Sequence, residues 1–225
     1  MFSVLFEVNP HEPQWNAYLD LAKALRPDLE EIDGFVDNIR YRSLTRPGWI
    51  LSLSGWRDEK SLVRWRTRAR HHDAQVAGRE RILADYHLRV GQITADTHVP
   101  EGQQILEQRL DETHVGAATT VVLLDAQRPG ATEEPPQAIA AAFGLRPGLL
   151  GLVEHDVYEA VLTPGDVLLM TAWAGAADAE DFASPTALPA QTRRRQIRVV
   201  RDYGMYDRRE NPQYYPERLP SSVTV

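Results

Sequence analysis

Polar side chains suited to ligand binding recur at helical spacing between residues 65 and 81. His71, Gln75 and Arg79 follow one another at intervals of four residues, so on a continuous helix they share one face. We expect them to line a pocket, with a solvated polar face as the alternative. Trp65 precedes His71 by about 240° of helix rotation and is expected to point into the core. The adjacent His71 and His72 diverge by about 100°, so they are not expected to bind one metal together.

A strand predicted near residue 38 offers a further polar group. Asn38 shares one face of this strand with Arg40 and Arg42, because side chains alternate between the faces of a strand. The opposite face carries Phe35, Ile39 and Tyr41. If that apolar face lines a barrel, Asn38 faces the helices. The catalytic candidates are therefore His71, Asn38 and Arg79, and the candidates for substrate binding are Gln75, Trp49, Trp56 and Tyr86.

An internal repeat relates these residues to a second half of the chain. At a constant offset of 117, the coinciding pairs are Gly34 and Gly151, Tyr41 and Tyr158, Pro47-Gly48 and Pro164-Gly165, Trp56 and Trp173, and Asp85-Tyr86 and Asp202-Tyr203. One register shared over some fifty residues indicates a duplication. Asn38 corresponds to His155, whereas His71 corresponds to Leu188. The first half is therefore the preferred site, and the alternative cluster in the second half is His155, Tyr158 and Tyr203.

Each half has the pattern strand, helix, strand, strand, helix, strand. Apolar periodicity predicts strands at 3–8, 34–44, 49–56 and 85–95, and helices at 15–32 and 59–81, the second one capped by Asp58. The second half predicts strands at 119–125, 149–162, 166–173 and 197–202, and helices at 136–143 and 177–195. This order is that of the ferredoxin-like unit, whose sheet has one bare face. We predict an α+β chain in which two ferredoxin-like βαββαβ units close into an α+β barrel.

The predicted organisation has four parts. They are a first repeat at 1–95, a connector at 96–117, a more divergent second repeat at 118–204, and a Tyr/Pro-rich tail at 205–225. Because the repeat supplies both sheets, one chain is expected to complete one barrel. Assembly of several such chains into a homo-oligomer through the tail remains an alternative.

Composition excludes several classes of protein. Of 225 residues, 25% are charged and 43% hydrophobic, which is ordinary for a globular protein. A net charge of −7 argues against a nucleic-acid partner, and no apolar run is long enough for a membrane helix. The absence of cysteine excludes disulfides and thiolate metal sites. The chain starts with a strand pattern in place of a signal peptide, so a cytoplasmic location is expected.

Several segments of the first half match a known family. They are Val4-Leu5-Phe6-Glu7-Val8, Asp33-Gly34-Phe35, Pro47-Gly48-Trp49, Leu51 through Glu59, and the set His71, Gln75, Gly78-Arg79, Tyr86 and Arg89-Val90. In these segments, residues 1–95 resemble the antibiotic-biosynthesis monooxygenase family. The resemblance implies a barrel that most members form by dimerising, so this chain resembles a fused pair. It also implies a ligand pocket between helix and sheet.

The resemblance implies an enzyme, and the first hypothesis is a monooxygenase. Its expected substrates are dioxygen and an electron-rich aromatic or polyketide-like small molecule, with no cofactor. A deprotonated phenol or enol can pass an electron to dioxygen when the protein supplies a base, donors for the oxyanion and a dry pocket.

Two alternatives stay open. The first is a haem-binding or haem-degrading protein on the same scaffold. Haem-degrading relatives place an axial histidine ten residues after a tryptophan, and Gln75 stands ten residues after Trp65. His71 would then have to be the haem ligand, and no other metal site is expected. The second alternative is a non-enzymatic small-molecule-binding or stress barrel.

Overall fold

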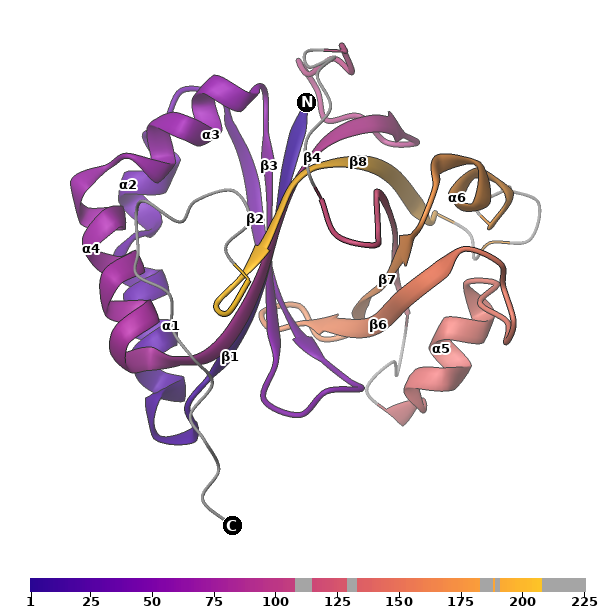
Figure 1. Ribbon diagram of the computed structural model, residues 1–225, viewed down its shortest axis with the longest axis horizontal. Coiled ribbons are helices and arrows are strands. Elements are labelled where there is room, and N and C mark those ends of the chain that lie inside the picture. Colours follow the sequence, from indigo (N-terminus) through magenta and orange to yellow (C-terminus); the bar gives the residue numbers. More distant parts are fainter. Residues whose placement is uncertain (108–114, 129–132, 183–187, 189–190, 208–225) are drawn as a thin grey trace.

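Eight antiparallel strands close into one barrel in the computed structural model, which describes residues 1–107, 115–128, 133–182, 188 and 191–207. The strands of the first half are β1 (Phe2–Pro10), β2 (Phe35–Ser43), β3 (Ile50–Trp56) and β4 (Leu83–Asp96). Those of the second half are β5 (Thr120–Gln127), β6 (Leu152–Ala160), β7 (Asp166–Trp173) and β8 (Arg193–Gly204). Around the barrel they run β1-β3-β2-β6-β7-β5-β8-β4 (Figure 1).

Each half of this barrel has the strand order of a ferredoxin-like sheet. The order is β4-β1-β3-β2 in the first half and β8-β5-β7-β6 in the second. The two sheets join where β2 pairs with β6 and β4 pairs with β8. The predicted fold class, two ferredoxin-like units closing into an α+β barrel, is confirmed. Residues 108–114 of the predicted connector and 208–225 of the predicted tail lie outside the described residues.

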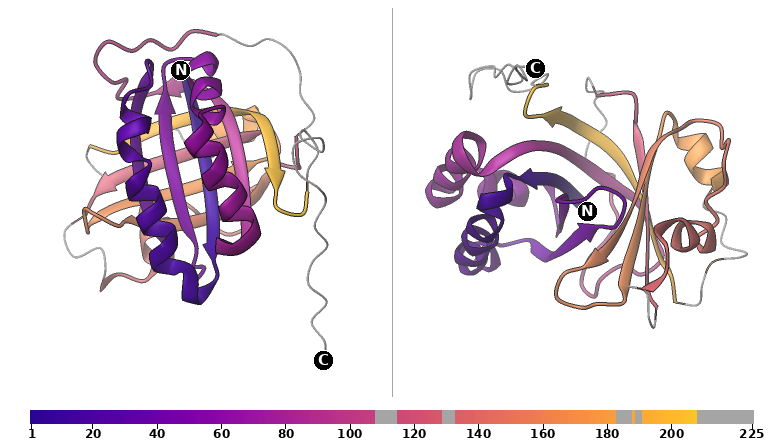
Figure 2. Two further views of the ribbon diagram at one scale, coloured as in Figure 1. Left: turned by 90° about the vertical axis from the view of Figure 1, so that its left-hand side faces the viewer. Right: turned by 90° about the horizontal axis from the view of Figure 1, so that it is seen from below.

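The helices lie outside the barrel, one group on each half (Figure 2). Those of the first half are η1 (Glu12–Gln14), α1 (Trp15–Ala24), α2 (Arg26–Glu30), α3 (Glu59–Arg66), α4 (Ala69–Ala77) and the π-helical turn η2 (Gly78–Ile82). Those of the second half are α5 (Pro136–Ala142) and α6 (Ala176–Phe182). Within the described residues, no helix is long and apolar enough to cross a membrane.

Three predicted helices differ from the observed ones. The helix predicted at 15–32 is divided at Leu25, just before Pro27, whose missing N–H and ring disfavour a continuous helix. The helix predicted at 59–81 begins as expected, with Asp58 accepting a hydrogen bond from the Ser61 N–H at 2.8 Å. It is then divided at 67–68, where Arg68 adopts an extended conformation.

The third difference concerns the helix predicted at 177–195. In the described residues α6 ends at Phe182, and Arg193, Arg194 and Arg195 belong to β8. The charges of the strand are neutralised there, because Arg193 pairs with Asp96 at 2.7 Å and Arg195 with Asp125 at 2.6 Å. These tertiary partners, distant in sequence, override the local helical pattern.

The two halves also share details of their packing. Trp56 donates its indole N–H to Ser54 Oγ at 2.9 Å, and Trp173 donates to Thr171 Oγ1 at 2.8 Å. Both pairs are related by the offset of 117, so equivalent buried tryptophans make equivalent hydrogen bonds.

The interior of the barrel is apolar in its middle. The residues packed there come from both halves and include Leu5, Tyr41, Leu51, Leu53, Ile93, Val121, Leu123, Tyr158, Leu168, Met170 and Ile197. This core leaves the bare faces of the two sheets covered by each other, which explains why neither half needs a second chain to cover its sheet.

A glycine at the start of β2 holds the first half's helix layer close to the sheet. Gly34 has φ +91°, and a Cβ there would lie 2.1 Å from Ser61 Oγ. We expect Gly34→Ala to lower the free energy of unfolding by about 1–3 kcal/mol more than Gly102→Ala. Gly102 also has a positive φ, +75°, but nothing lies within 4 Å of its Cβ position. Denaturant unfolding of the two variants measures the difference. Equal losses in the free energy of unfolding would show that the Ser61 side chain moves aside at no energetic cost.

Candidate active site

A cavity of about 240 Å³ lies between the helices of the first half and the outer face of its sheet. Its apolar walls come from α1, α2, α3, β1 and β4, with Leu21, Leu29, Leu62, Phe6 and Leu88 among the lining residues. Strand β8 of the second half also reaches the cavity, through Arg201 and Tyr203. The cavity therefore depends on both repeats, although its helices belong to one.

Six of the site residues predicted in the first half line this cavity. They are Asn38, Trp56, His71, Gln75, Arg79 and Tyr86. The expectation that Asn38 faces the helices also fits, because Tyr41 on the opposite face of β2 packs inside the barrel. The structure thus brings together residues from β2, β3, β4, α4 and η2.

Asn38 is held in one orientation by the strand beside it. Its Nδ2 donates to Ser52 Oγ at 3.0 Å and to the Leu53 carbonyl oxygen at 3.2 Å. Because a carbonyl oxygen only accepts, these bonds place the amide nitrogen toward β3. Asn38 Oδ1 is buried and has no hydrogen-bond partner among the described residues. Asn38 therefore offers the cavity an acceptor and no donor.

His71 does not point away from Trp65, as a continuous helix would require. The two rings stack with centroids 4.2 Å apart and planes 15° from parallel. The break at 67–68 reorients α4 relative to α3, so the rotation counted along one helix does not apply. Both rings line the cavity.

The His71 ring is neutral at physiological pH. Its pKa is lowered to about 4, chiefly by burial and also by the charges of Arg66 and His72, whereas a hydrogen bond with the Trp65 carbonyl oxygen opposes the fall. That bond joins Nδ1 to the Trp65 oxygen at 3.0 Å, so Nδ1 carries the proton and Nε2 the lone pair. A histidine with so low a pKa is a weak base, and its expected part in the site is to accept a hydrogen bond.

Arg79 is buried at the far end of the cavity. Its guanidinium donates to the Tyr86 hydroxyl at 2.8 Å and to the Met205 carbonyl oxygen at 3.1 Å. Met205 directly follows β8, so Arg79 connects the helix layer of the first half with the end of the second. Gln75 lies one turn before Arg79 in the wall.

The charged residues of the cavity walls are mostly basic. Four arginines line the cavity, namely Arg40, Arg66, Arg79 and Arg201, together with a single carboxylate, Glu59. Glu59 is paired with Arg201 at 2.9 Å. A basic cavity in a protein of net charge −7 favours an anionic ligand.

Trp49 and Tyr158 do not line this cavity, so the structure does not bring Trp49 together with the other residues predicted to bind substrate. The Trp49 ring packs beneath the Arg46 guanidinium, 4.6 Å from it. Tyr158 is fully buried inside the barrel, where its hydroxyl donates to Glu7 Oε1 at 2.9 Å. The turn between β2 and β3 folds over the end of the barrel and carries Trp49 away from the helices.

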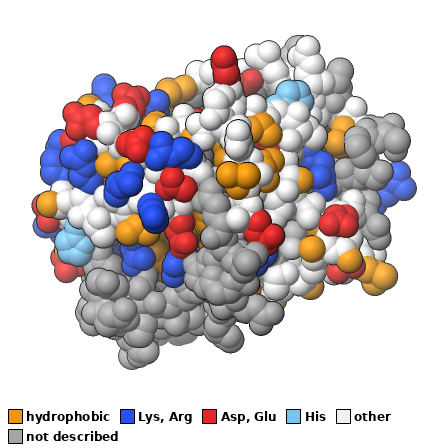
Figure 3. Space-filling model, turned by 90° about the horizontal axis from the view of Figure 1, so that it is seen from above, with side chains coloured by type: hydrophobic (Ala, Val, Ile, Leu, Met, Phe, Trp, Pro, Cys, Tyr) orange, Lys and Arg blue, Asp and Glu red, His pale blue; other side chains and the backbone are white. Residues whose placement is uncertain are grey.

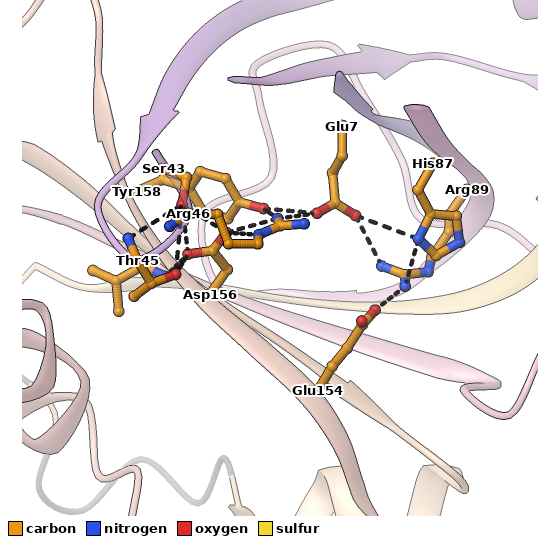
Figure 4. A network of polar contacts seen from close by, with 10 residues as sticks. Glu7, Ser43, Thr45, Arg46, His87, Arg89, Glu154, Asp156 and Tyr158 are labelled. Carbon is orange, nitrogen blue, oxygen red and sulfur yellow. Dashed lines mark hydrogen bonds and ion pairs between the residues drawn. The ribbon is translucent and has the colours of Figure 1, made fainter. Parts of the chain in front are cut away.

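Arg46, Glu7 and Tyr158 belong to a polar network at one end of the barrel interior (Figure 4). Arg46 donates to Asp156 at 2.7 Å and to the Tyr158 hydroxyl at 2.7 Å, and it pairs with Glu7. Arg89 pairs with Glu7 at 3.2 Å and also with Glu154. The network joins strands of both halves and closes the barrel end with paired charges.

The cluster predicted for the second half does not form. His155 is exposed on β6, Tyr158 is inside the barrel, and Tyr203 lines the first-half cavity. The helix layer of the second half is instead filled by a fully buried Phe143 and by Trp173 against Phe182, with ring centroids 5.0 Å apart.

The cavity of about 240 Å³ is small for a porphyrin, and His71, the haem ligand considered from the sequence, would have to bind iron through Nε2 because its Nδ1 is engaged by the Trp65 carbonyl oxygen. Among the described residues, no group of three or more His, Asp or Glu side chains could hold a metal ion.

The fold and the site together define a fused α+β barrel with a small-molecule cavity between helices and sheet. The family model for antibiotic biosynthesis monooxygenase matches residues 1–77. A jasmonate monooxygenase from Pyricularia oryzae is 50% identical over 222 residues, which are 96% of this chain and 99% of that protein. The chain belongs to the antibiotic biosynthesis monooxygenase family.

Solved structures give weaker matches. An anthrone oxidase-like protein has 14% identity and a TM-score of 0.33, covering 91% of this chain and 93% of its own. A conserved protein from Methanosarcina mazei has 18% identity and a TM-score of 0.37, covering 40% of this chain and 88% of its own.

Sequence reasoning missed three wall residues, Tyr18, Arg40 and Arg201. Arg40 stands two residues after Asn38, so strand alternation places it on the same face and could have indicated it as a wall residue. No sequence pattern indicates Tyr18 or Arg201, because their positions depend on how α1 and β8 pack.

Proposed function

We propose that this chain is a monooxygenase that oxidises a small, largely apolar carboxylic acid of the jasmonate type with dioxygen and without haem. The observation that carries the proposal is the cavity itself, apolar in most of its walls and basic at its charged positions. Jasmonate is an acid with a cyclopentanone ring and a hydrocarbon side chain, which matches such walls. The relative named for jasmonate supports the same substrate class.

The wall residues supply the oxyanion donors and the shielding from water that oxygenation of an enolisable ketone requires. The enolate formed by loss of an α-proton passes an electron to dioxygen, and the two combine at the α-carbon as a hydroperoxide, which takes up a proton. Loss of water from the hydroperoxide leaves a carbonyl group, so the substrate supplies all the electrons, one oxygen atom is retained and the other leaves as water. Arg79 and Arg40 can donate to anionic oxygens, whereas Asn38 Oδ1 can accept from a hydroxyl. The stacked Trp65 and His71 add an aromatic part to the wall.

The reaction is tested with jasmonic acid under ¹⁸O₂, in the presence of a chelator and without added hemin. We expect a product that contains one ¹⁸O atom. No product from jasmonic acid, together with turnover of phenols, would return the substrate to the electron-rich aromatic class. A product that forms only after hemin is added would reject the haem-free reaction.

Filling the cavity tests its place in the reaction. We expect Ala22→Trp to weaken jasmonic acid binding at least tenfold, because Ala22 is a wall residue of α1 and the new ring occupies the cavity. Ala24→Trp is the matched control, since Ala24 is exposed on the same helix and is not a wall residue. Calorimetric titration of both folded variants gives the comparison. Equal affinities would place the binding site elsewhere.

A further inference from the structure

Two buried polar atoms on the cavity face of β2 lack a hydrogen-bond partner in the described part of the chain. They are Asn38 Oδ1 and Arg40 Nε. The first accepts a hydrogen bond and the second donates one. Two residues along a strand, the side chains are about 7 Å apart. A buried polar atom without a partner costs about 1–3 kcal/mol, so such a pair is expected where a ligand supplies the missing groups.

Arg40 differs from the other arginines of β2 and its following turn. Arg42 pairs with the buried Glu159, and Arg46 pairs with Glu7 and Asp156. No ion pair joins Arg40 to a carboxylate in the part of the chain that the structure describes. A cavity-lining guanidinium without a carboxylate from its own chain can take one from a ligand.

Tyr18 borders the same position from α1. Its side chain is buried in the cavity wall, where burial raises the pKa of its hydroxyl and the neighbouring Arg40 guanidinium opposes that rise. The phenol therefore stays neutral and leaves the charge of Arg40 uncompensated. A neutral hydroxyl beside the guanidinium can also donate to a ligand oxygen.

We propose that Arg40 determines substrate specificity by binding the free carboxylate of the substrate, while Asn38 Oδ1 accepts a hydrogen bond from an O–H group about 7 Å away. This inference rests on the proposed function and names the residue that selects acids over their esters. A methyl ester keeps the apolar body of the acid but loses its charge. It therefore loses the charge-assisted bond to Arg40 and leaves the buried Arg40 Nε without an acceptor.

The experiment compares jasmonic acid with methyl jasmonate by titration calorimetry. We expect the parent to bind the acid at least tenfold more tightly than the ester, since bonds to charged groups are strong. Arg40→Gln is expected to bring the ratio of acid affinity to ester affinity close to one. It should do so by weakening the binding of jasmonic acid, while the affinity for the ester stays within twofold of that of the parent. Arg64→Gln, on the exposed outer side of α3, is the control and should keep the parental ratio.

Arg40→Lys serves if Arg40→Gln fails to fold. It keeps the charge and loses the planar fork, so we expect an intermediate ratio. A parent that binds acid and ester equally, or an Arg40 variant that keeps the tenfold ratio, overturns the inference. Equal ¹⁸O incorporation into acid and ester would leave the monooxygenase proposal intact and reject the role of Arg40. A binding ratio that collapses in Arg40→Gln without any oxygenated product would support Arg40 and reject the monooxygenase.

Discussion

Glu7→Leu is expected to lower the free energy of unfolding by about 3–5 kcal/mol, because it removes the buried anion that pairs with the buried Arg89 guanidinium. Glu7 pairs with both Arg46 and Arg89 inside the barrel and accepts from the Tyr158 hydroxyl. The Arg89 and Glu7 side chains are each 3% exposed. Without Glu7, the Arg89 guanidinium retains Glu154, whose side chain is 45% exposed and lies at the rim.

Chemical denaturation of the purified chain measures this loss. Asp33→Ala is the control, since Asp33 is an exposed partner of Arg57, and exposed ion pairs contribute little to stability. The surface over α2 and α3 carries basic and acidic side chains interspersed in this way (Figure 3). The double variant Glu7→Leu/Arg89→Met should recover part of the loss, because it removes a buried cation together with its anion. A small loss in Glu7→Leu would show that water enters the barrel end.

The second large effect is a dependence of stability on pH that comes from His71. The pKa of His71 is about 4 in the folded chain and 6.5 as its ordinary value. As pH falls from 6.5 toward 4, the unfolded state takes up the proton first, so the folded state loses stability. The expected loss is about 3 kcal/mol at most. Above the ordinary value both states are neutral, and His71 adds no pH dependence.

Unfolding curves between pH 7 and pH 4 (about one measurement per half unit) test this expectation. His71→Gln should lose less stability than the parent over that range. His155→Gln is the control, because His155 is exposed and should follow the parent. Parallel curves for the parent and His71→Gln would mean that the His71 ring is solvated in the folded chain.

Much of the fold could be predicted from the sequence, because duplication repeats the residues that fold each half. Trp56 and Trp173, and Gly34 and Gly151, mark the same register in both copies, and each pair occupies equivalent positions in the structure. Strand alternation placed Asn38 and Tyr41 on opposite faces of their strand, and the structure shows that the Tyr41 face is the one inside the barrel. Family membership rests on matched residues that sequence comparison reads directly.

The detailed arrangement of the cavity depended on tertiary structure. His71, Gln75 and Arg79 line the cavity as predicted, but the helix that carries them is divided at 67–68. The division places Trp65 against His71, which no count of residues along one helix predicts. Burial lowers the pKa of His71, so its neutral ring can accept a hydrogen bond in the cavity.

The sequence by itself determined the repeat, the strand order and the residue types of the first-half site, since these follow from local periodicity and from one register. Only the tertiary structure decided that Trp49 packs on Arg46, that β8 brings Arg201 to the cavity, and that Arg40 lacks a carboxylate partner within the described chain. The physical reason is that burial and charge pairing depend on contacts between residues far apart in sequence. Glu7 and Tyr158 are 151 residues apart and meet only when the barrel closes.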